Sequence, residues 1–175
     1  MTLALPARAK LNLDLEVVGR DKDGFHQIRT TFQAIDLHDL LVVSAADETT
    51  IATSGLSVSA KDNSVLAAHA ALERAAHKQL PATFHLHKRI PPGSGMGGAS
   101  SDAAATLRAL KMMYALGLDL APIAKELGSD VPFFLFGGRA RGEGRGERLT
   151  PTLCCSRTQC ACSWSARARW TRTSR

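Results

Sequence analysis

Cysteine is absent from the first 153 residues of this 175-residue chain. Disulfides therefore cannot hold that part of the fold together, which favours a reducing compartment, and we expect a cytoplasmic protein. No apolar run approaches the ~18 residues that a membrane-spanning helix needs. The N-terminus also lacks the basic and then apolar order of a signal peptide. The sequence thus predicts no membrane partner.

Acidic residues are absent from residues 151–175, and this tail differs from the rest of the chain in other ways. It contains five arginines, all four cysteines and both tryptophans. Without these five arginines, 17 basic residues face 16 acidic ones, so the net charge of +6 comes mainly from the tail. The tail has neither helix nor strand periodicity, and its cysteine spacing is unlike that of zinc sites. We predict that it is disordered or an out-of-frame translation.

The basic tail raises one alternative function, a nucleotide-binding or nucleic-acid-binding module that is not an enzyme. Its charge would attract nucleic acid without regard to base sequence. Aromatic side chains are not interleaved with basic ones on one face of the chain, however, so reading of particular bases is not expected. We therefore predict no specific nucleic-acid partner.

Residues 1–150 show the patterns of one α+β domain. Residues 9–18 alternate between apolar and polar side chains, which predicts a strand whose apolar side chains share one buried face. That face comprises Ala9, Leu11, Leu13, Leu15 and Val17. Further strands of an antiparallel sheet are predicted at residues 25–33, 38–45 and 48–53, and another strand at residues 82–87.

Helices are predicted at three places in this domain. Asn63 or Ser64 can cap the first helix, because short polar side chains accept hydrogen bonds from the free amides of a helix start. The apolar face of this helix comprises Val65, Ala68, Leu72, Ala75 and Ala76. The second helix has Ala99, Ala103, Leu107, Leu110 and Tyr114 at helical spacing. A shorter helix spans residues 122–127 and ends at Gly128, where we expect the left-handed conformation.

A glycine loop, IPPGSGMGGASSD, leads directly into the second of these helices. Glycines without a Cβ let backbone amides approach an anion, and the helix adds its N-terminal amides and positive dipole end. A phosphate is therefore the expected ligand. The loop is not a Walker A motif, because it does not end in Gly-Lys-Ser/Thr. The alternative is a flexible surface loop. The predicted nucleotide-binding residues are Pro91, Pro92, Gly93, Ser94, Gly95, Met96, Gly97, Gly98, Ala99, Ser100 and Ser101.

The loop PPGSGMGGASSDAAA resembles the second motif of the GHMP kinases, a superfamily of small-molecule kinases. Three further segments match the same superfamily in the expected order: PARAKLNLDLEVVGRDKDGFHQIRTTFQ, DNSVLAAHAAL and LGSDVPFFLFGGRARGEGRGERL. The resemblance implies a GHMP kinase N-terminal domain over residues 1–150, a strand-rich sheet covered by helices. It also implies ATP and Mg²⁺, and Ser101 is a possible metal ligand. Nothing after Leu149 resembles the superfamily's second, C-terminal domain, so we expect a C-terminally truncated chain.

The resemblance also implies roles for five residues. Asp130 matches the catalytic aspartate that accepts the proton of the substrate hydroxyl, and Lys10 matches the lysine that orients it and stabilises negative charge. Asn12 is expected to bind the substrate. Phe25 and His26 occupy the place where relatives recognise a cytosine ring, with phenylalanine where many carry tyrosine. From spacing alone, Asp130 could equally cap a helix, and Lys10 would be an ordinary solvated lysine.

Within the superfamily the chain resembles the branch that phosphorylates a hydroxyl of a cytidine-diphosphate-linked sugar alcohol in non-mevalonate isoprenoid synthesis. The segment GFHQIRTTFQ carries this more specific likeness. Two alternatives remain: a related kinase of the homoserine kinase type, and an inactive nucleotide-binding fragment.

Overall fold

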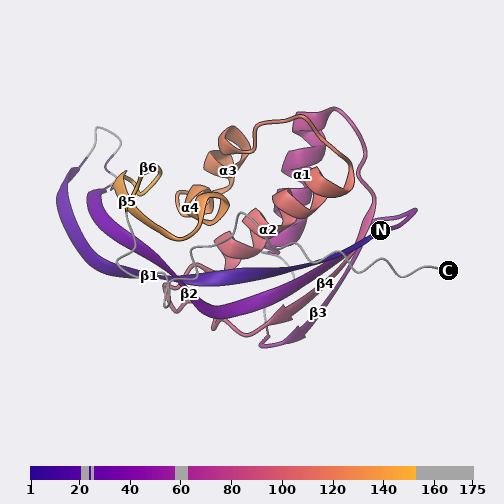
Figure 1. Ribbon diagram of the computed structural model, residues 1–175, viewed down its shortest axis with the longest axis horizontal. Helices are drawn as coiled ribbons and strands as arrows, with labels where there is room; N and C mark the ends of the chain where they lie inside the picture. The colour runs from indigo at the N-terminus through magenta and orange to yellow at the C-terminus, as the bar shows by residue number, and fades with distance from the viewer. Residues whose placement is uncertain (21–23, 25, 58–62, 153–175) are drawn as a thin grey trace.

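The computed structural model describes residues 1–20, 24, 26–57 and 63–152. The predictions made for Phe25 and for nearly all of the basic tail therefore lie outside the described residues. Over the described part, one sheet and a layer of helices confirm the predicted α+β class (Figure 1). No helix within the described ranges is long and apolar enough to cross a membrane.

Six strands in the described residues form a single mixed sheet. They are β1 (Thr2–Arg20), β2 (His26–Ala45), β3 (Thr50–Gly55), β4 (Ala82–Lys88), β5 (Arg139–Gly144) and β6 (Arg148–Pro151). The long strand β2 organises the sheet, because β1 pairs with it along most of its length on one side. On its other side, β4 pairs with the C-terminal part of β2 and β5 pairs with the N-terminal part. The predicted strands at 25–33 and 38–45 are thus parts of one strand.

Four helices in the described residues lie on one side of this sheet (Figure 1). They are α1 (Ser64–Ala76), α2 (Gly98–Met113), α3 (Ala121–Leu127) and α4 (Val131–Phe136). Asn63 caps α1 as predicted, since its side chain accepts a hydrogen bond from the backbone N–H of Val65 at 3.0 Å. Ala75 is exposed, however, because it lies outside the face of α1 that is buried against α2 and α3.

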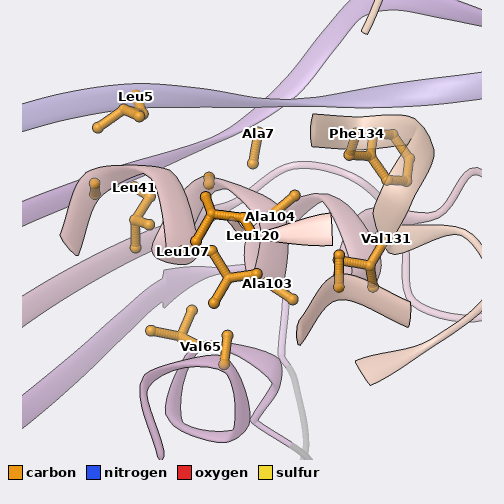
Figure 2. Packing of buried hydrophobic residues seen from close by; sticks show 14 of the residues in the cluster. Leu5, Ala7, Leu41, Val65, Ala103, Ala104, Leu107, Leu120, Val131 and Phe134 are labelled. Carbon is orange, nitrogen blue, oxygen red and sulfur yellow. The ribbon is translucent and has the colours of Figure 1, made fainter. Parts of the chain in front are cut away.

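The hydrophobic core lies between the sheet and the helices α1 and α2. Figure 2 shows Leu5 and Ala7 of β1 facing Ala104 and Leu107 of α2 across this layer. The alternation predicted for β4 is confirmed, with Ala82, Phe84 and Leu86 all buried. This packing fixes β4 and α2 relative to each other, and the glycine loop connects their ends.

The predicted buried face of the first strand is wrong beyond Ala9. Leu11, Leu13, Leu15 and Val17 are between 43% and 61% exposed. The pairing of β1 with β2 shifts register between Arg8 and Lys10, and both Ala9 and Lys10 are buried. Past this irregularity, β1 and β2 extend beyond α1 and α2 (Figure 1), so these helices do not cover the apolar side chains. Alternation in the sequence predicted the strand but not what covers it.

Three further details differ from the sequence predictions. The strand β3 runs parallel to β4, so the sheet is mixed rather than antiparallel. Gly128 has φ 158° and ψ 158°, which is not the left-handed helical conformation expected there. The elements α4, β5 and β6 were not predicted, because their runs of six residues or fewer are too short to show a clear period.

Candidate active site

The glycine loop leaves β4 and enters α2 on a chain of turns that only glycine accommodates well. Gly93, Gly95 and Gly97 have φ of 74°, 74° and 72°, a region that costs other residues about 1–2 kcal/mol each. A Cβ on Gly95 would meet no atom within 4 Å, so the loop faces open space there. The backbone around Gly95 and the α2 N-terminus are therefore accessible to an anion, while the amides of Ser94 and Met96 donate within the loop to Pro91 and Ser94.

Because Gly97 has no Cβ, the side chains of Phe134 and Lys10 can pack directly against the loop. A Cβ at this position would lie 2.7 Å from Cζ of Phe134 and 3.3 Å from Cγ of Lys10. The backbone N–H of Lys10 also donates a hydrogen bond to the carbonyl of Met96 at 2.9 Å. Because α4 carries Phe134 and β1 carries Lys10, the loop is held against both elements.

Lys10 and Asp130 form an ion pair beside the loop. The Nζ atom of Lys10 lies 3.2 Å from Oδ2 of Asp130, and the lysine side chain is only 7% exposed. Asp130 is the residue immediately before α4, and 30% of its side chain is exposed, so its carboxylate is accessible to solvent. The structure thus brings together two residues that stand 120 positions apart in the sequence.

The ammonium of Lys10 is held by further contacts. It donates to Oδ1 of Asn12 at 2.6 Å and lies 4.9 Å from the ring centroid of Phe32, within the range of a cation–π interaction. The Nδ2 amide of Asn12 donates in turn to Oγ1 of Thr30 at 3.1 Å. The predicted residues Lys10, Asn12 and Asp130 therefore form one connected cluster.

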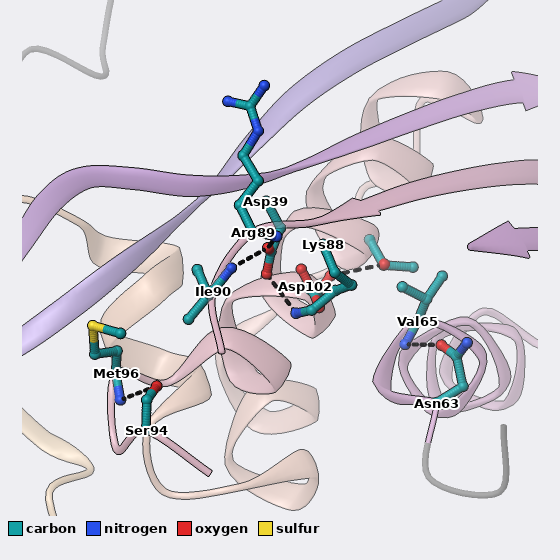
Figure 3. A network of polar contacts seen from close by, with 10 residues as sticks. Asp39, Asn63, Val65, Lys88, Arg89, Ile90, Ser94, Met96 and Asp102 are labelled. Carbon is teal, nitrogen blue, oxygen red and sulfur yellow. Dashed lines mark hydrogen bonds and ion pairs between the residues drawn. The ribbon is translucent and has the colours of Figure 1, made fainter. Parts of the chain in front are cut away.

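A second, buried cluster lies at the two ends of the glycine loop (Figure 3). The ammonium of Lys88, the last residue of β4, lies 2.5 Å from Oδ2 of Asp39 and 2.7 Å from Oδ2 of Asp102. All three side chains are at most 4% exposed. Oδ1 of Asp39 accepts hydrogen bonds from the backbone N–H groups of Arg89 and Ile90, just before the loop.

This buried cluster holds two carboxylates against one ammonium. Burial, together with the nearby charge of Asp39, raises the pKa of Asp102 to about 7, although Lys88 opposes the shift. Burial alone would lower the pKa of Lys88, but Asp102 and Asp39 outweigh it, so that the pKa of Lys88 is raised. In addition, Oδ1 of Asp102 has no hydrogen-bond partner among the described residues. Asp102 is therefore the least well compensated member of the cluster.

The remaining predicted site residues lie in different surroundings. Ser101 is only 3% exposed and lines a small pocket with Arg8 and Arg108, on the side of α2 that faces the sheet. His26 is exposed and pairs with Arg20 at the far end of the β1–β2 hairpin. His26 lies six positions before Phe32, the partner of Asn12, and six positions span about 20 Å along a straight strand. His26 is thus not part of the Lys10 cluster.

Sequence reasoning did not single out the buried cluster, yet a signal was present. Lys88 has the same strand parity as the buried Ala82, Phe84 and Leu86, and Asp39 has the parity of the buried Leu41 and Val43. A charged residue at such a position is buried with a partner or is not in a strand. No comparable signal marked Thr30 or Phe32 as neighbours of Lys10, because that contact depends on the register of β1 and β2.

This chain is similar to known kinases in sequence and in structure. Residues 63–138 match the family model described as the GHMP kinases N terminal domain. A protein of Marinobacter nauticus named 4-diphosphocytidyl-2-C-methyl-D-erythritol kinase is 45% identical over 157 residues, covering 86% of this chain and 55% of that protein. A Bordetella pertussis protein of the same name is 46% identical over 151 residues, covering 83% of this chain and 50% of that protein. The chain spans about half the length of the curated relatives it matches.

Solved structures agree with these sequence matches. A crystal structure of 4-(cytidine 5'-diphospho)-2C-methyl-D-erythritol kinase superposes with a TM-score of 0.76 at 39% identity, covering 86% of this chain and 55% of that one. A homoserine kinase from Cytophaga hutchinsonii superposes with a TM-score of 0.58 at 21% identity, covering 80% of this chain and 48% of that one. This similarity indicates a common fold. Residues 63–138 thus resemble the GHMP kinases N terminal domain, and the described residues share their fold with the kinase structure at 39% identity.

Proposed function

We propose that the glycine loop binds the phosphates of ATP and that Lys10 and Asp130 act on the alcohol that receives the terminal phosphoryl group. The observation that supports this most strongly is the position of Lys10. Its backbone N–H donates to the loop carbonyl of Met96 at 2.9 Å, while its ammonium lies 3.2 Å from Asp130. A phosphate held by the loop would thus lie next to the proposed base and a fixed positive charge.

The proposed reaction is transfer of the γ-phosphoryl group to a hydroxyl. Asp130 accepts the proton of the hydroxyl, whose oxygen forms the new bond to the γ-phosphorus. The bond between that phosphorus and the bridging oxygen breaks, and ADP leaves with the electron pair. Lys10 stabilises negative charge on the transferring group and keeps Asp130 oriented. Mg²⁺ would neutralise charge on the nucleotide phosphates.

The described residues offer few ligands for that metal. Across the ranges 1–20, 24, 26–57 and 63–152 there is no group of three or more His, Cys, Asp or Glu side chains that could hold a metal ion. This agrees with an ion that arrives with the nucleotide, because Mg²⁺ at kinase sites is held largely by substrate phosphates and water. Ser100, in the first turn of α2, is better placed than the buried Ser101 to add a hydroxyl ligand.

For the substrate we propose a sugar alcohol linked to cytidine diphosphate. The curated relatives at 45% and 46% identity are both named 4-diphosphocytidyl-2-C-methyl-D-erythritol kinase. Asn12 would bind the alcohol near Lys10, and Phe25 and His26 would contact the cytosine. A homoserine kinase activity is the second candidate, but the similarity that supports it is 21% and extends to the fold alone.

Gly95→Ala tests whether the loop binds phosphate. The added methyl group meets no neighbouring atom, but φ of 74° at this position is unfavourable for alanine by about 1–2 kcal/mol. This strain shifts the loop away from the conformation described above, in which Gly95 has a positive φ. We therefore expect the affinity for the ATP analogue AMP-PNP to fall about 5- to 30-fold in isothermal titration calorimetry.

The matched control is Gly117→Ala, because this exposed glycine also has no atom within 4 Å of a Cβ and lies outside the positive-φ region. We expect its affinity for AMP-PNP to equal that of the unchanged chain. Equal affinities for all three proteins would contradict the proposed phosphate site.

A further inference from the structure

The buried cluster of Asp39, Lys88 and Asp102 connects three parts of the chain that meet around the glycine loop. Asp39 belongs to β2, Lys88 ends β4, and Asp102 lies in the first turns of α2. Lys88 thus precedes the loop and Asp102 follows it, and their side chains are 2.7 Å apart. Figure 3 shows the ammonium of Lys88 between the two carboxylates.

The cluster also fixes the backbone on the entry side of the loop. Oδ1 of Asp39 accepts from the N–H of Ile90 at 2.8 Å and from the N–H of Arg89 at 2.5 Å. On the exit side, a Cβ on Gly98 would lie 3.3 Å from Nζ of Lys88 and 3.0 Å from Cγ2 of Ile90. The entry and exit segments are therefore packed directly against each other at the base of the loop.

Stability does not explain why two buried carboxylates share one ammonium. When both are ionised, the cluster carries one surplus negative charge, and Oδ1 of Asp102 has no partner among the described residues. Removal of Asp102 would still leave Lys88 paired with Asp39 at 2.5 Å. Buried ion pairs contribute little net stability in general, because desolvation offsets the attraction between the charges.

We propose that Asp39, Lys88 and Asp102 form a clamp that holds the two ends of the glycine loop together and so sets the position of its amides. Asp39 fixes the entry strand, Asp102 fixes the first turns of α2, and Lys88 joins them. The three side chains are positioning residues that touch no substrate. The consequence for nucleotide binding rests on the proposed function, whereas the clamp itself can be tested without any ligand.

The test compares Asp102→Ala with Asp102→Asn at pH 8 by amide hydrogen exchange followed by NMR. The reporters are amides whose hydrogen bonds depend on the loop: Lys10, which donates to Met96, and Ser94, which donates to Pro91. We expect exchange at these amides to accelerate about tenfold or more in Asp102→Ala, because one charge-assisted hydrogen bond is lost. The asparagine keeps an oxygen for Lys88 and is expected to retain most of the protection.

Amides in β6 and α1, away from the loop, are expected to exchange at unchanged rates in both variants. The free energy of unfolding of Asp102→Ala should not fall at this pH, which separates a positioning role from a merely structural one. The matched control is Asp47→Ala, an exposed aspartate outside the cluster. Unchanged exchange at Lys10 and Ser94 in Asp102→Ala, or an increase spread equally over β6 and α1, would overturn the clamp.

Calorimetry with AMP-PNP on the same proteins separates the clamp from the proposed function. If the clamp positions the amides for phosphate, Asp102→Ala binds AMP-PNP about tenfold more weakly and Asp102→Asn restores the affinity. If the unchanged chain binds no AMP-PNP while the exchange results are as expected, the clamp stands and the proposed phosphate site fails. If exchange responds but affinity does not, the link between clamp and nucleotide is wrong.

Discussion

In the proposed reaction, Asp130→Asn is expected to lower the rate of ADP release in the presence of ATP and a cytidine-diphosphate-linked sugar alcohol by about 10²- to 10⁴-fold. An asparagine has the shape of aspartate but cannot accept the proton of the hydroxyl. Lys10 remains bonded to Asn12 at 2.6 Å and stays over the Phe32 ring, so the fold should persist. A coupled assay for ADP measures the rate, and calorimetry with AMP-PNP should give an unchanged affinity.

Asp119→Asn provides a matched control for this prediction. Asp119 also precedes a short helix and accepts a hydrogen bond from the backbone N–H of Ala121 at 3.0 Å. It lies on the surface and makes no contact with Lys10 in the described part of the chain. We expect its turnover to match that of the unchanged chain. A rate for Asp130→Asn within about threefold of the unchanged chain would show that this carboxylate is not the base.

The free energy of unfolding is expected to depend on pH through Asp102. The pKa of its carboxyl is about 7 in the folded protein and 3.8 for an ordinary aspartate, so the folded state binds a proton more tightly. The contribution of this group is therefore fully present below about pH 4 and is lost as the pH rises through 7. Over this window the loss amounts to about 4 kcal/mol, at roughly 1.4 kcal/mol per pH unit.

Asp102→Asn isolates this contribution, because asparagine does not titrate. Urea unfolding at pH 4 and pH 8 gives the free energy of unfolding of both proteins, and we expect the chain with Asp102 to lose about 4 kcal/mol relative to the variant. The raised pKa of Lys88 acts only above its ordinary value of 10.5, outside this window. A difference between the two proteins that stays constant from pH 4 to pH 8 would contradict the raised pKa of Asp102.

Local patterns in the sequence predicted most of the elements that carry the site. The cap at Asn63, the alternation of β4 and the helix behind the glycines are all confirmed, because each depends on residues close together in the chain. The family resemblance pointed to Lys10 and Asp130, and the structure places them 3.2 Å apart. Neither periodicity nor spacing could have shown that pairing, since β1 and α4 are brought together only by the tertiary fold, in which both pack against α2.

What could not be predicted depends on which surfaces meet. The exposure of Leu11, Leu13 and Leu15 follows from the end of the helical layer, a property of helix length and sheet curvature rather than of alternation. The triad of Asp39, Lys88 and Asp102 requires β2, β4 and α2 to converge. Parity suggests that Asp39 and Lys88 are buried, but only the fold shows that they are partners of one another.

A crystal structure of this chain with AMP-PNP and Mg²⁺ tests the central claim most directly. We expect the phosphates to lie against the amides of residues 93–98, with the γ-phosphate next to Lys10 and within reach of Asp130. A nucleotide bound elsewhere, or a γ-phosphate turned away from Asp130 and the α2 N-terminus, would contradict the assignment of the glycine loop as the phosphate site.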